Sequence, residues 1–254
     1  MNSANENYNQ IAQKAKATII HGFAFESLFA DLALQKISKS GVIINSLKTI
    51  YHFNQRMISP GTRMTMKLSK FRDSLKIDNG IWSISNIKKD LILVEIENNS
   101  YQYAIQYSLP EIAYAYWNYD TASAESFLIV DDTEAKLLSE KPKLSGDPLK
   151  ALDKLRNRKK TGPVKEIRKS QKCRLIVSVN TGTEDEVNAI LTSSDMYLNT
   201  AKSIVLAIKK IFKNGNKVYG VVSPGLIFQD SLSQTINNLS IDFKLNQNVN
   251  FKNV

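Results

Sequence analysis

Residues 91–107 read LILVEIENNSYQYAIQY, and this stretch decides the fold class. Its first half places Ile92, Val94 and Ile96 at every second position, and its second half repeats that period with tyrosines and an isoleucine. A period of two is typical of a strand with one buried face, and the polar residues 98–100 between the halves indicate a turn. The stretch therefore predicts a pair of antiparallel strands.

The pattern changes towards the N-terminus. Residues 64–68 also alternate and are interpreted as a strand that follows a turn at residues 59–61. Before that turn the apolar residues recur at helical spacing, which predicts one helix over residues 25–32 and a second over residues 43–51. We therefore expect N-terminal helices followed by an antiparallel meander of about four strands.

The C-terminal part mixes the two periods. Residues 174–179 predict a strand, and residues 183–191 predict a helix that opens with threonine and has glutamate at its fourth position, as in a capping box. Residues 199–213 predict a second helix. The predicted fold class is α+β, with N-terminal helices and an antiparallel β-meander followed by a smaller C-terminal α/β unit.

The positive charge of the chain is concentrated in residues 141–174. This segment holds 13 lysines and arginines against three acidic residues, a net charge of +10 that equals the net charge of the whole chain. It also holds three of the six prolines, which is typical of a boundary. We therefore predict helices plus an antiparallel sheet over 1–130, a basic connecting segment over 131–172 that contains a short helix at residues 148–159, and the smaller α/β unit over 173–254.

A concentrated basic segment is the electrostatic footprint of a contact with a polyanion, and a solvated linker is the alternative. The predicted function is a non-enzymatic nucleic-acid-binding protein, with RNA as the preferred partner and viral nucleocapsid, matrix or movement proteins as the suggested type. A matrix-like protein bound to an anionic membrane surface is a second hypothesis. The residues expected to contact nucleic acid are Lys154, Arg156, Arg158, Lys159, Lys160, Lys165, Arg168, Lys169 and Lys172.

Six of the ten tyrosines lie between residues 101 and 119. Three readings of this cluster stay open: a core strand with an aromatic-rich connection, self-association, or stacking on nucleobases. The residues assigned to self-association are Tyr101, Tyr103 and Tyr107.

Catalytic motifs are scarce in the sequence. Two histidines and the single Cys173 are too few for a typical zinc site, and the phosphate-binding Gly-rich loops and the nucleophile elbow are absent. We therefore expect no enzyme, no cofactor and no metal. The alternative is a metal-dependent phosphoryl-transfer enzyme that uses Asp131 and Asp132 at the end of a strand, against the structural role of capping a short helix there.

The N-terminal residues 1–16 are polar and contain no apolar signal core. The expected location is intracellular, in the cytoplasm or nucleus, and the basic clusters on either side of residues 161–163 could act as a nuclear import signal.

Overall fold

The structure is a computed structural model that describes residues 2–54, 58–69, 73–85, 91–97, 100–140, 162–182, 185–214 and 218–253. Its strands, in chain order, are β1 (Thr18–Ile20), β2 (Ser46–Phe53), β3 (Leu75–Asp78), β4 (Ile81–Ile84), β5 (Ile92–Glu97), β6 (Ser100–Gln106), β7 (Ser123–Val130), β8 (Lys172–Asn180), β9 (Glu186–Ser194), β10 (Gly220–Val222), β11 (Asp242–Leu245) and β12 (Phe251–Asn253). Its helices are α1 (Asn2–Lys14), α2 (Phe25–Lys39), α3 (Pro60–Ser69), α4 (Glu111–Tyr119), α5 (Asp132–Glu140), α7 (Lys165–Ser170), α8 (Met196–Asn214), the 3₁₀ helix η1 (Pro224–Phe228) and α9 (Leu232–Asn238).

A ten-stranded mixed sheet organises the described residues. Eight strands follow the order β11-β9-β8-β2-β7-β6-β5-β12, while β3 pairs with β4 and β7 beside this path. The central strand β2 runs parallel to β7 and antiparallel to β8. The two short strands β1 and β10 pair in parallel as a separate sheet. Helices and a mixed sheet together confirm the predicted α+β class.

Two apolar rows cross the centre of the sheet, one on each face. In the first row, Phe127, Ile50, Ile176 and Ile190 lie in register across β7, β2, β8 and β9. They pack with partly buried apolar residues of the C-terminal segment, including Phe251. Because apolar burial is the main stabilising term of a fold, a central strand covered on both faces is firmly held.

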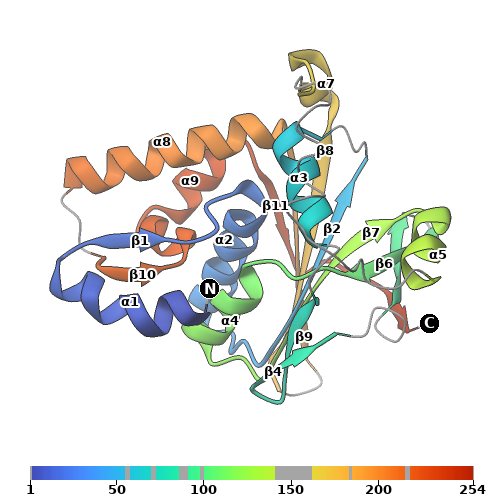
Figure 1. The fold of residues 1–254 in the computed structure, drawn as a ribbon, viewed down its shortest axis with the longest axis horizontal. Helices are drawn as coiled ribbons and strands as arrows, with labels where there is room; N and C mark the ends of the chain where they lie inside the picture. The colour runs from blue at the N-terminus through green and yellow to red at the C-terminus, as the bar shows by residue number, and fades with distance from the viewer. Residues whose placement is uncertain are drawn as a thin grey trace.

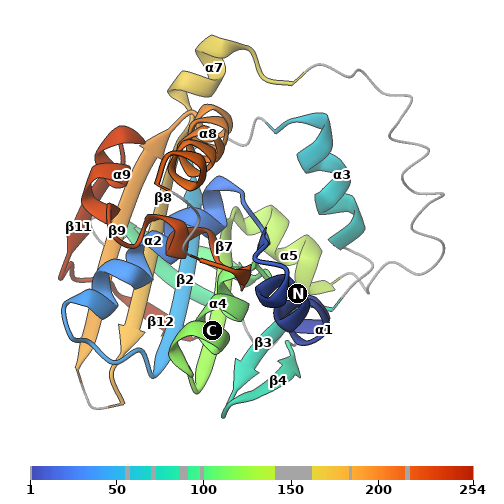
Figure 2. The same cartoon turned by 90° about the vertical axis from the view of Figure 1, so that its left-hand side faces the viewer.

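The second row lies under helices. Tyr51, Leu175 and Leu191 occupy neighbouring strands and pack with the buried side chains of α2. Figures 1 and 2 show α2 lying against this face of the sheet, with α8 and α9 next to it. This helical layer carries the polar groups described in the next subsection.

Several elements predicted from the sequence are confirmed. The helix over 25–32 is part of α2, the strands over 91–107 form the antiparallel pair β5 and β6, and the strand over 174–179 is part of β8. The helix over 199–213 lies within α8. Each has one clear period or, for β8, a short run of β-branched residues.

The helix predicted over 43–51 is wrong, because these residues lead into and form most of strand β2. The apolar spacing looked helical because both faces of β2 are buried, so apolar residues follow one another without alternation. The β-branched residues Thr49 and Ile50 suit a strand at the centre of the sheet.

The strand predicted over 64–68 is also wrong, because these residues belong to helix α3. The start of α3 is fixed by Ser59 and Pro60, which the sequence interpretation assigned to a turn. The Oγ atom of Ser59 accepts a hydrogen bond from the backbone N–H of Thr62 at 3.1 Å. A serine cap followed by proline at the first helical position is a strong helix start.

The helix predicted over 183–191 is replaced by strand β9, which pairs along its whole length with β8. Gly182 has a φ of +89° in the connection between the two strands. This backbone conformation suits the turn of a hairpin. The glutamate of the supposed capping box, Glu186, is the first residue of β9, where its carboxylate accepts a hydrogen bond from the Ser178 hydroxyl.

Two further predictions concern the connecting segment. The short basic helix expected over 148–159 lies outside the described residues. Strand β8, which follows most of that segment, pairs with β2, which precedes it, and β9 pairs with β8, so the sheet is continuous across the predicted boundaries. The division into the units 1–130, 131–172 and 173–254 stays a prediction. None of the helices in the described residues has the length and apolar character of a membrane span.

Candidate active site

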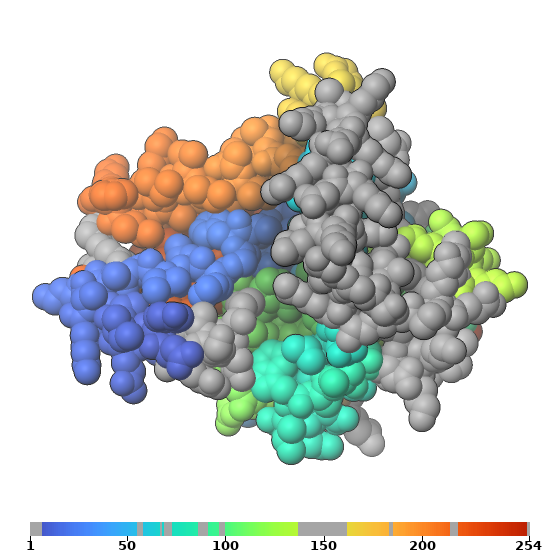
Figure 3. Space-filling model, in the orientation of Figure 1, coloured from blue at the N-terminus to red at the C-terminus, as the bar shows by residue number. Residues whose placement is uncertain are grey.

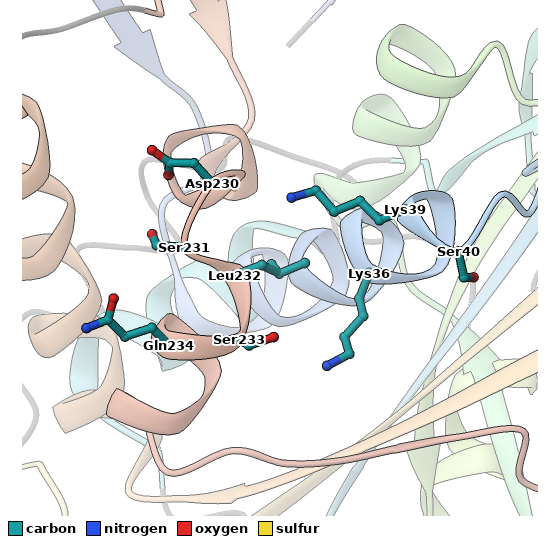
Figure 4. A pocket seen from close by; sticks show the side chains of 8 residues that line it. All are labelled: Lys36, Lys39, Ser40, Asp230, Ser231, Leu232, Ser233 and Gln234. Atoms are coloured by element: carbon teal, nitrogen blue, oxygen red, sulfur yellow. The ribbon is translucent and has the colours of Figure 1, made fainter.

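A groove opens between the C-terminal end of α2 and the chain that leads into α9. It encloses about 550 Å³. Two lysines lie on its α2 side, while hydroxyl and amide groups line the opposite side (Figure 4). The lining residues are Lys36, Lys39, Ser40, Asp230, Ser231, Leu232, Ser233 and Gln234. The groove therefore combines cationic and hydrogen-bonding groups.

The two lysines of α2 are held in defined positions. Lys36 projects its ammonium group over the ring of Phe243, 5.0 Å from the ring centroid. Lys39 donates a hydrogen bond to the backbone carbonyl of Gln229, and its side chain points towards the Asp230–Ser231 side of the groove in Figure 4. Fixed cations beside open space favour an anionic ligand.

A third lysine reaches the same place from α8. The Nζ atom of Lys210 lies 2.7 Å from the Oγ atom of Ser231, and it also contacts the Asp230 carboxylate. Burial, together with the nearby charge of Lys39, lowers the pKa of Lys210. Its side chain is only 19% exposed, whereas that of Asp230 is 74% exposed, so water screens the Asp230 charge more strongly.

Ser231 occupies the N-cap position of α9, but its side chain makes no cap hydrogen bond. An N-cap serine normally accepts a bond from a backbone N–H in the first turn of its helix. Here the hydroxyl oxygen accepts a hydrogen bond from the Nζ atom of Lys210 instead. A hydroxyl in the wall of the groove is thus in contact with a basic group on α8.

The interior under α2 contains a second set of polar groups, the carboxyls of Asp31 and Glu111. Each residue is 0% exposed. The Oε1 atom of Glu111 accepts a hydrogen bond from the Thr49 hydroxyl at 3.0 Å and lies 2.8 Å from the Tyr51 hydroxyl, whereas its Oε2 atom has no partner among the described residues. Burial raises the pKa of Glu111 to about 7.

Counting hydrogens around Tyr51 supports a protonated Glu111. The Tyr51 hydroxyl has one hydrogen but lies within bonding distance of two acceptors, Glu111 and the backbone carbonyl of Glu26 at 3.0 Å. If the hydroxyl donates to the carbonyl, its oxygen can accept a hydrogen from Glu111. A neutral Glu111 supplies the hydrogen that this network needs. With a charged Glu111, one of the two acceptors would have no donor from Tyr51.

Asp31 joins α2 to η1. Its Oδ2 atom accepts a hydrogen bond of 2.5 Å from the backbone N–H of Gly225. Burial raises the pKa of Asp31 to about 6, although hydrogen bonds from Ser223 and Gln35 act in the opposite direction. A Cβ atom at Gly225 would lie 2.6 Å from the Asp31 carboxyl carbon, so this contact requires glycine. We infer a structural role for both buried carboxyls: Asp31 links α2 to η1, and Glu111 links α4 to β2.

The structure describes only part of the predicted nucleic-acid-binding set. Lys154, Arg156, Arg158, Lys159 and Lys160 lie outside the described residues. Lys165, Lys169 and Lys172 are exposed, near or on α7.

Arg168 differs from these exposed lysines. It is partly buried, and its Nε atom lies 3.3 Å from the Asp195 carboxylate. It therefore links α7 to the start of α8.

Asp131 and Asp132, the pair named in the phosphoryl-transfer alternative, have different positions at the start of α5. The Oδ1 atom of Asp131 accepts a hydrogen bond of 2.7 Å from the backbone N–H of Glu134, so it caps α5, while Asp132 is exposed in the first turn of that helix. The part of the chain that the structure describes contains no group of three or more histidine, cysteine or acidic residues suited to a metal ion.

The aromatic cluster is divided between interior and surface. Tyr114 on α4 is 1% exposed and donates a hydrogen bond of 2.5 Å to the backbone carbonyl of His21. Tyr101 on β6 is partly exposed, with the Lys252 ammonium 4.1 Å from its ring centroid. Tyr103 and Tyr107 are also partly exposed, so self-association through these three tyrosines stays a prediction.

The comparisons with known proteins give a fold and no family. Neither the protein-family models nor the curated proteins contain a match. Among solved structures, the chain is similar to apo histidine-tagged saccharopine dehydrogenase (L-Glu forming) from Saccharomyces cerevisiae, with a TM-score of 0.53 and 9% sequence identity. The match covers 94% of this chain and 77% of the yeast chain. At this identity the likeness shows a shared fold alone.

This likeness corrects the functional prediction. The interpretation as a non-enzymatic RNA-binding protein of viral type is wrong, because the fold it shares is that of a dehydrogenase. The membrane-binding and phosphoryl-transfer alternatives are not retained either. The expectation of no enzyme finds no support in this likeness.

Dinucleotide cofactors usually bind at the turn between the first strand of an open parallel sheet and the next helix, but here β1 pairs with β10 in a sheet separate from the ten-stranded one. A Cβ atom at Gly22, in the turn from β1 to α2, would lie 2.8 Å from the Tyr114 hydroxyl, so protein atoms fill that space. Glu26 adds a carboxyl group to the first turn of α2. We therefore derive no cofactor step from the likeness.

Proposed function

We propose that the protein is an enzyme that acts on a small carboxylate- or phosphate-bearing molecule in the α2–α9 groove, with Ser231 as nucleophile and Lys210 as its base. The observation that carries this proposal is the distance of 2.7 Å between the Lys210 Nζ atom and the Oγ atom of Ser231, which lines the groove. A hydroxyl becomes an effective nucleophile when a neighbouring base accepts its proton. The fold likeness to a dehydrogenase supports an enzyme and does not define this chemistry.

The environment of Lys210 suits the role of a base. A lysine must be neutral to accept a proton, and burial and nearby cations both favour the neutral amine. Both conditions act on Lys210, through its limited exposure and through Lys39. Asp230 acts in the opposite direction, but its exposure to water weakens that effect.

The reaction class that fits this pair is acyl transfer. The Ser231 oxygen attacks the carbonyl carbon of an ester or amide while its proton passes to Lys210. The carbon–leaving-group bond then breaks, and the leaving group takes that proton from Lys210. Water hydrolyses the resulting acyl-serine and releases the acid. Lys36 and Lys39 would bind the anionic group of the substrate and orient its carbonyl.

A fluorophosphonate probe tests the nucleophile, because it reacts covalently with activated serines. We expect labelling at Ser231, confirmed by peptide mass spectrometry, and its loss in Ser231→Ala. Lys210→Met should slow labelling at least tenfold, since the base is removed. Ser233→Ala is the matched control, because Ser233 also lines the groove but is not bonded to Lys210. Equal labelling of the wild type and Ser231→Ala would disprove the assignment.

A further inference from the structure

Helix α8 exposes a continuous apolar stripe that the fold leaves uncovered. Its members recur at alternating intervals of three and four residues, which is the spacing of the a and d positions of a heptad. Four of them expose 44%, 49%, 49% and 83% of their surface, in chain order, and the alanine among them is also exposed. We call these residues the α8 seam: Leu198, Ala201, Val205, Ile208 and Phe212.

The exposure of the seam does not arise from a loosely held helix. The opposite face of α8 is packed into the protein, where Ser203 is 0% and Ala207 2% exposed. Ala207 belongs to the same apolar core as α2. Figures 1 and 3 show α8 along an outer edge of the molecule. The helix thus has two apolar faces, and within the described part of the chain only one of them is packed.

The shape of the seam matches another helix. An amphipathic helix facing a groove or a second helix is anchored at positions i, i+3, i+7 and so on, and the seam repeats this spacing over two heptads. From Leu198 to Phe212 it extends about 21 Å, at about 1.5 Å per residue. A partner helix of about 14 residues would cover it.

The charges beside the seam select the kind of partner. Helix α8 contains four lysines and no acidic residue. Lys202 and Lys209 each follow a d position of the seam directly, and both are exposed. A second copy of α8 would bring two cationic helices together, which is unfavourable. An acidic helix would place carboxylates opposite these lysines.

We propose that the α8 seam is a docking site for an amphipathic helix of a partner protein, with apolar residues in its own seam and aspartate or glutamate on either side. This surface lies outside the α2–α9 groove and does not depend on the chemistry proposed there. The apolar contacts would supply the affinity, and the lysines would set the preference for an acidic partner.

Designed peptides can test both parts of this proposal. The probe is a fluorescein-labelled peptide of three heptads with leucine at a and d and glutamate at e and g, and its counterpart carries lysine at e and g. We expect the full-length protein to raise the anisotropy of the glutamate peptide and to bind the lysine peptide at least tenfold more weakly. Equal binding of the two peptides would contradict the charge argument.

Variants then locate the site. Val205→Ser, Ile208→Ser and Phe212→Ser together should weaken glutamate-peptide binding at least tenfold, whereas Ile81→Ser with Ile84→Ser should not. The latter pair removes exposed isoleucines from β4, 69% and 65% exposed, far along the chain from α8. Lys202→Glu with Lys209→Glu should reverse the peptide preference. This reversal leaves the seam itself intact, so it distinguishes lost docking from lost folding.

Three outcomes would overturn the proposal. One is glutamate-peptide binding that survives the triple serine variant. Another is concentration-dependent dimerisation in sedimentation experiments that the triple variant abolishes, which would assign the seam to a second copy. The third is seam-dependent binding to phosphatidylglycerol vesicles without binding to the glutamate peptide, which would assign it to lipid.

Discussion

Helix α2 carries two polar regions with opposite environments. Asp31, in the middle of the helix, is fully buried, whereas Lys36 and Lys39, towards its C-terminal end, line the open groove. Neither Asp31 nor the facing Glu111 forms an ion pair within the described part of the chain. Buried carboxyls without a cation favour their neutral form, while lysines beside water keep their charge. The buried Asp31 therefore has a structural role, whereas Lys36 and Lys39 are accessible to a ligand in the groove.

The largest expected effect concerns Glu111. Its pKa is about 7 in the folded protein and about 4.5 when unfolded, so the folded state binds the proton more tightly. Its contribution to stability is fully present below pH 4.5 and is lost as the pH rises to about 7. The shift corresponds to about 3 kcal/mol of unfolding free energy.

Glu111→Gln should remove this loss, because glutamine resembles the protonated carboxyl. We expect the variant to match the wild type near pH 4.5 and to exceed its free energy of unfolding by up to about 3 kcal/mol above pH 7. Urea unfolding at several pH values measures this. Glu166→Gln on α7 is the control, since Glu166 is exposed. A variant less stable than the wild type at pH 8 would contradict a neutral Glu111.

Whether one face or both faces of a strand are buried explains which strands the sequence predicts well. Strand β5 has one buried face, because Ile92, Val94 and Ile96 are buried while the residues between them are only partly buried, and the spacing of apolar residues reveals it. Strand β2 lies at the centre of the sheet, with Tyr51 packed on one face and Ile50 on the other. Its apolar residues therefore do not alternate with polar ones, and the sequence pattern does not reveal a strand. Spacing reports burial on one side and fails when both sides are covered.

The candidate active site was not predictable in the same way. Ser231 and Lys210 are 21 positions apart and meet only because α8 and the start of α9 pack against each other. No motif connects them. The sequence did contain a signal for the separate buried set: Asp31 is a lone carboxylate within the apolar run from Phe29 to Leu34, at a position that helical spacing places inside. Such a residue indicates a specific tertiary contact, but the sequence does not identify the partner of that contact.

A smaller effect is expected at the contact between Asp31 and η1. Gly225→Ala places a Cβ atom 2.6 Å from the Asp31 carboxyl carbon, so one of the two segments must move. Overpacking of this kind typically lowers the free energy of unfolding by about 1–3 kcal/mol. Gly61→Ala is the control: it lies in α3, where the nearest atom would be 3.7 Å away, and alanine should stabilise the helix there.

Denaturant unfolding of both glycine variants gives the comparison. A Gly225→Ala protein as stable as the wild type would show that the close approach to Asp31 is not required. The Asp31→Ala background adds a second check, because removing the carboxyl should reduce the cost of Gly225→Ala.

The groove lysines should affect ligand binding more than stability. Lys36→Gln removes a cation and its contact with the Phe243 ring, a loss of about 0.5–1 kcal/mol of unfolding free energy at most. Isothermal titration with glutarate as the probe should show at least threefold weaker binding, and a shallower dependence on salt. Lys169→Gln on the exposed face of α7 is the control. Equal affinities of the two variants would remove Lys36 from the anion site.

The smallest effect on stability is expected on the α8 seam. Phe212 is 83% exposed, so Phe212→Ser removes little buried apolar area and should change the free energy of unfolding by less than about 0.5 kcal/mol. Phe228 in η1 is 2% exposed, and Phe228→Ser should cost several kcal/mol by creating a cavity in the core. Thermal unfolding of the two variants measures the contrast. If Phe212→Ser were as destabilising as Phe228→Ser, the seam would already be packed within this chain and would not be free to dock a partner.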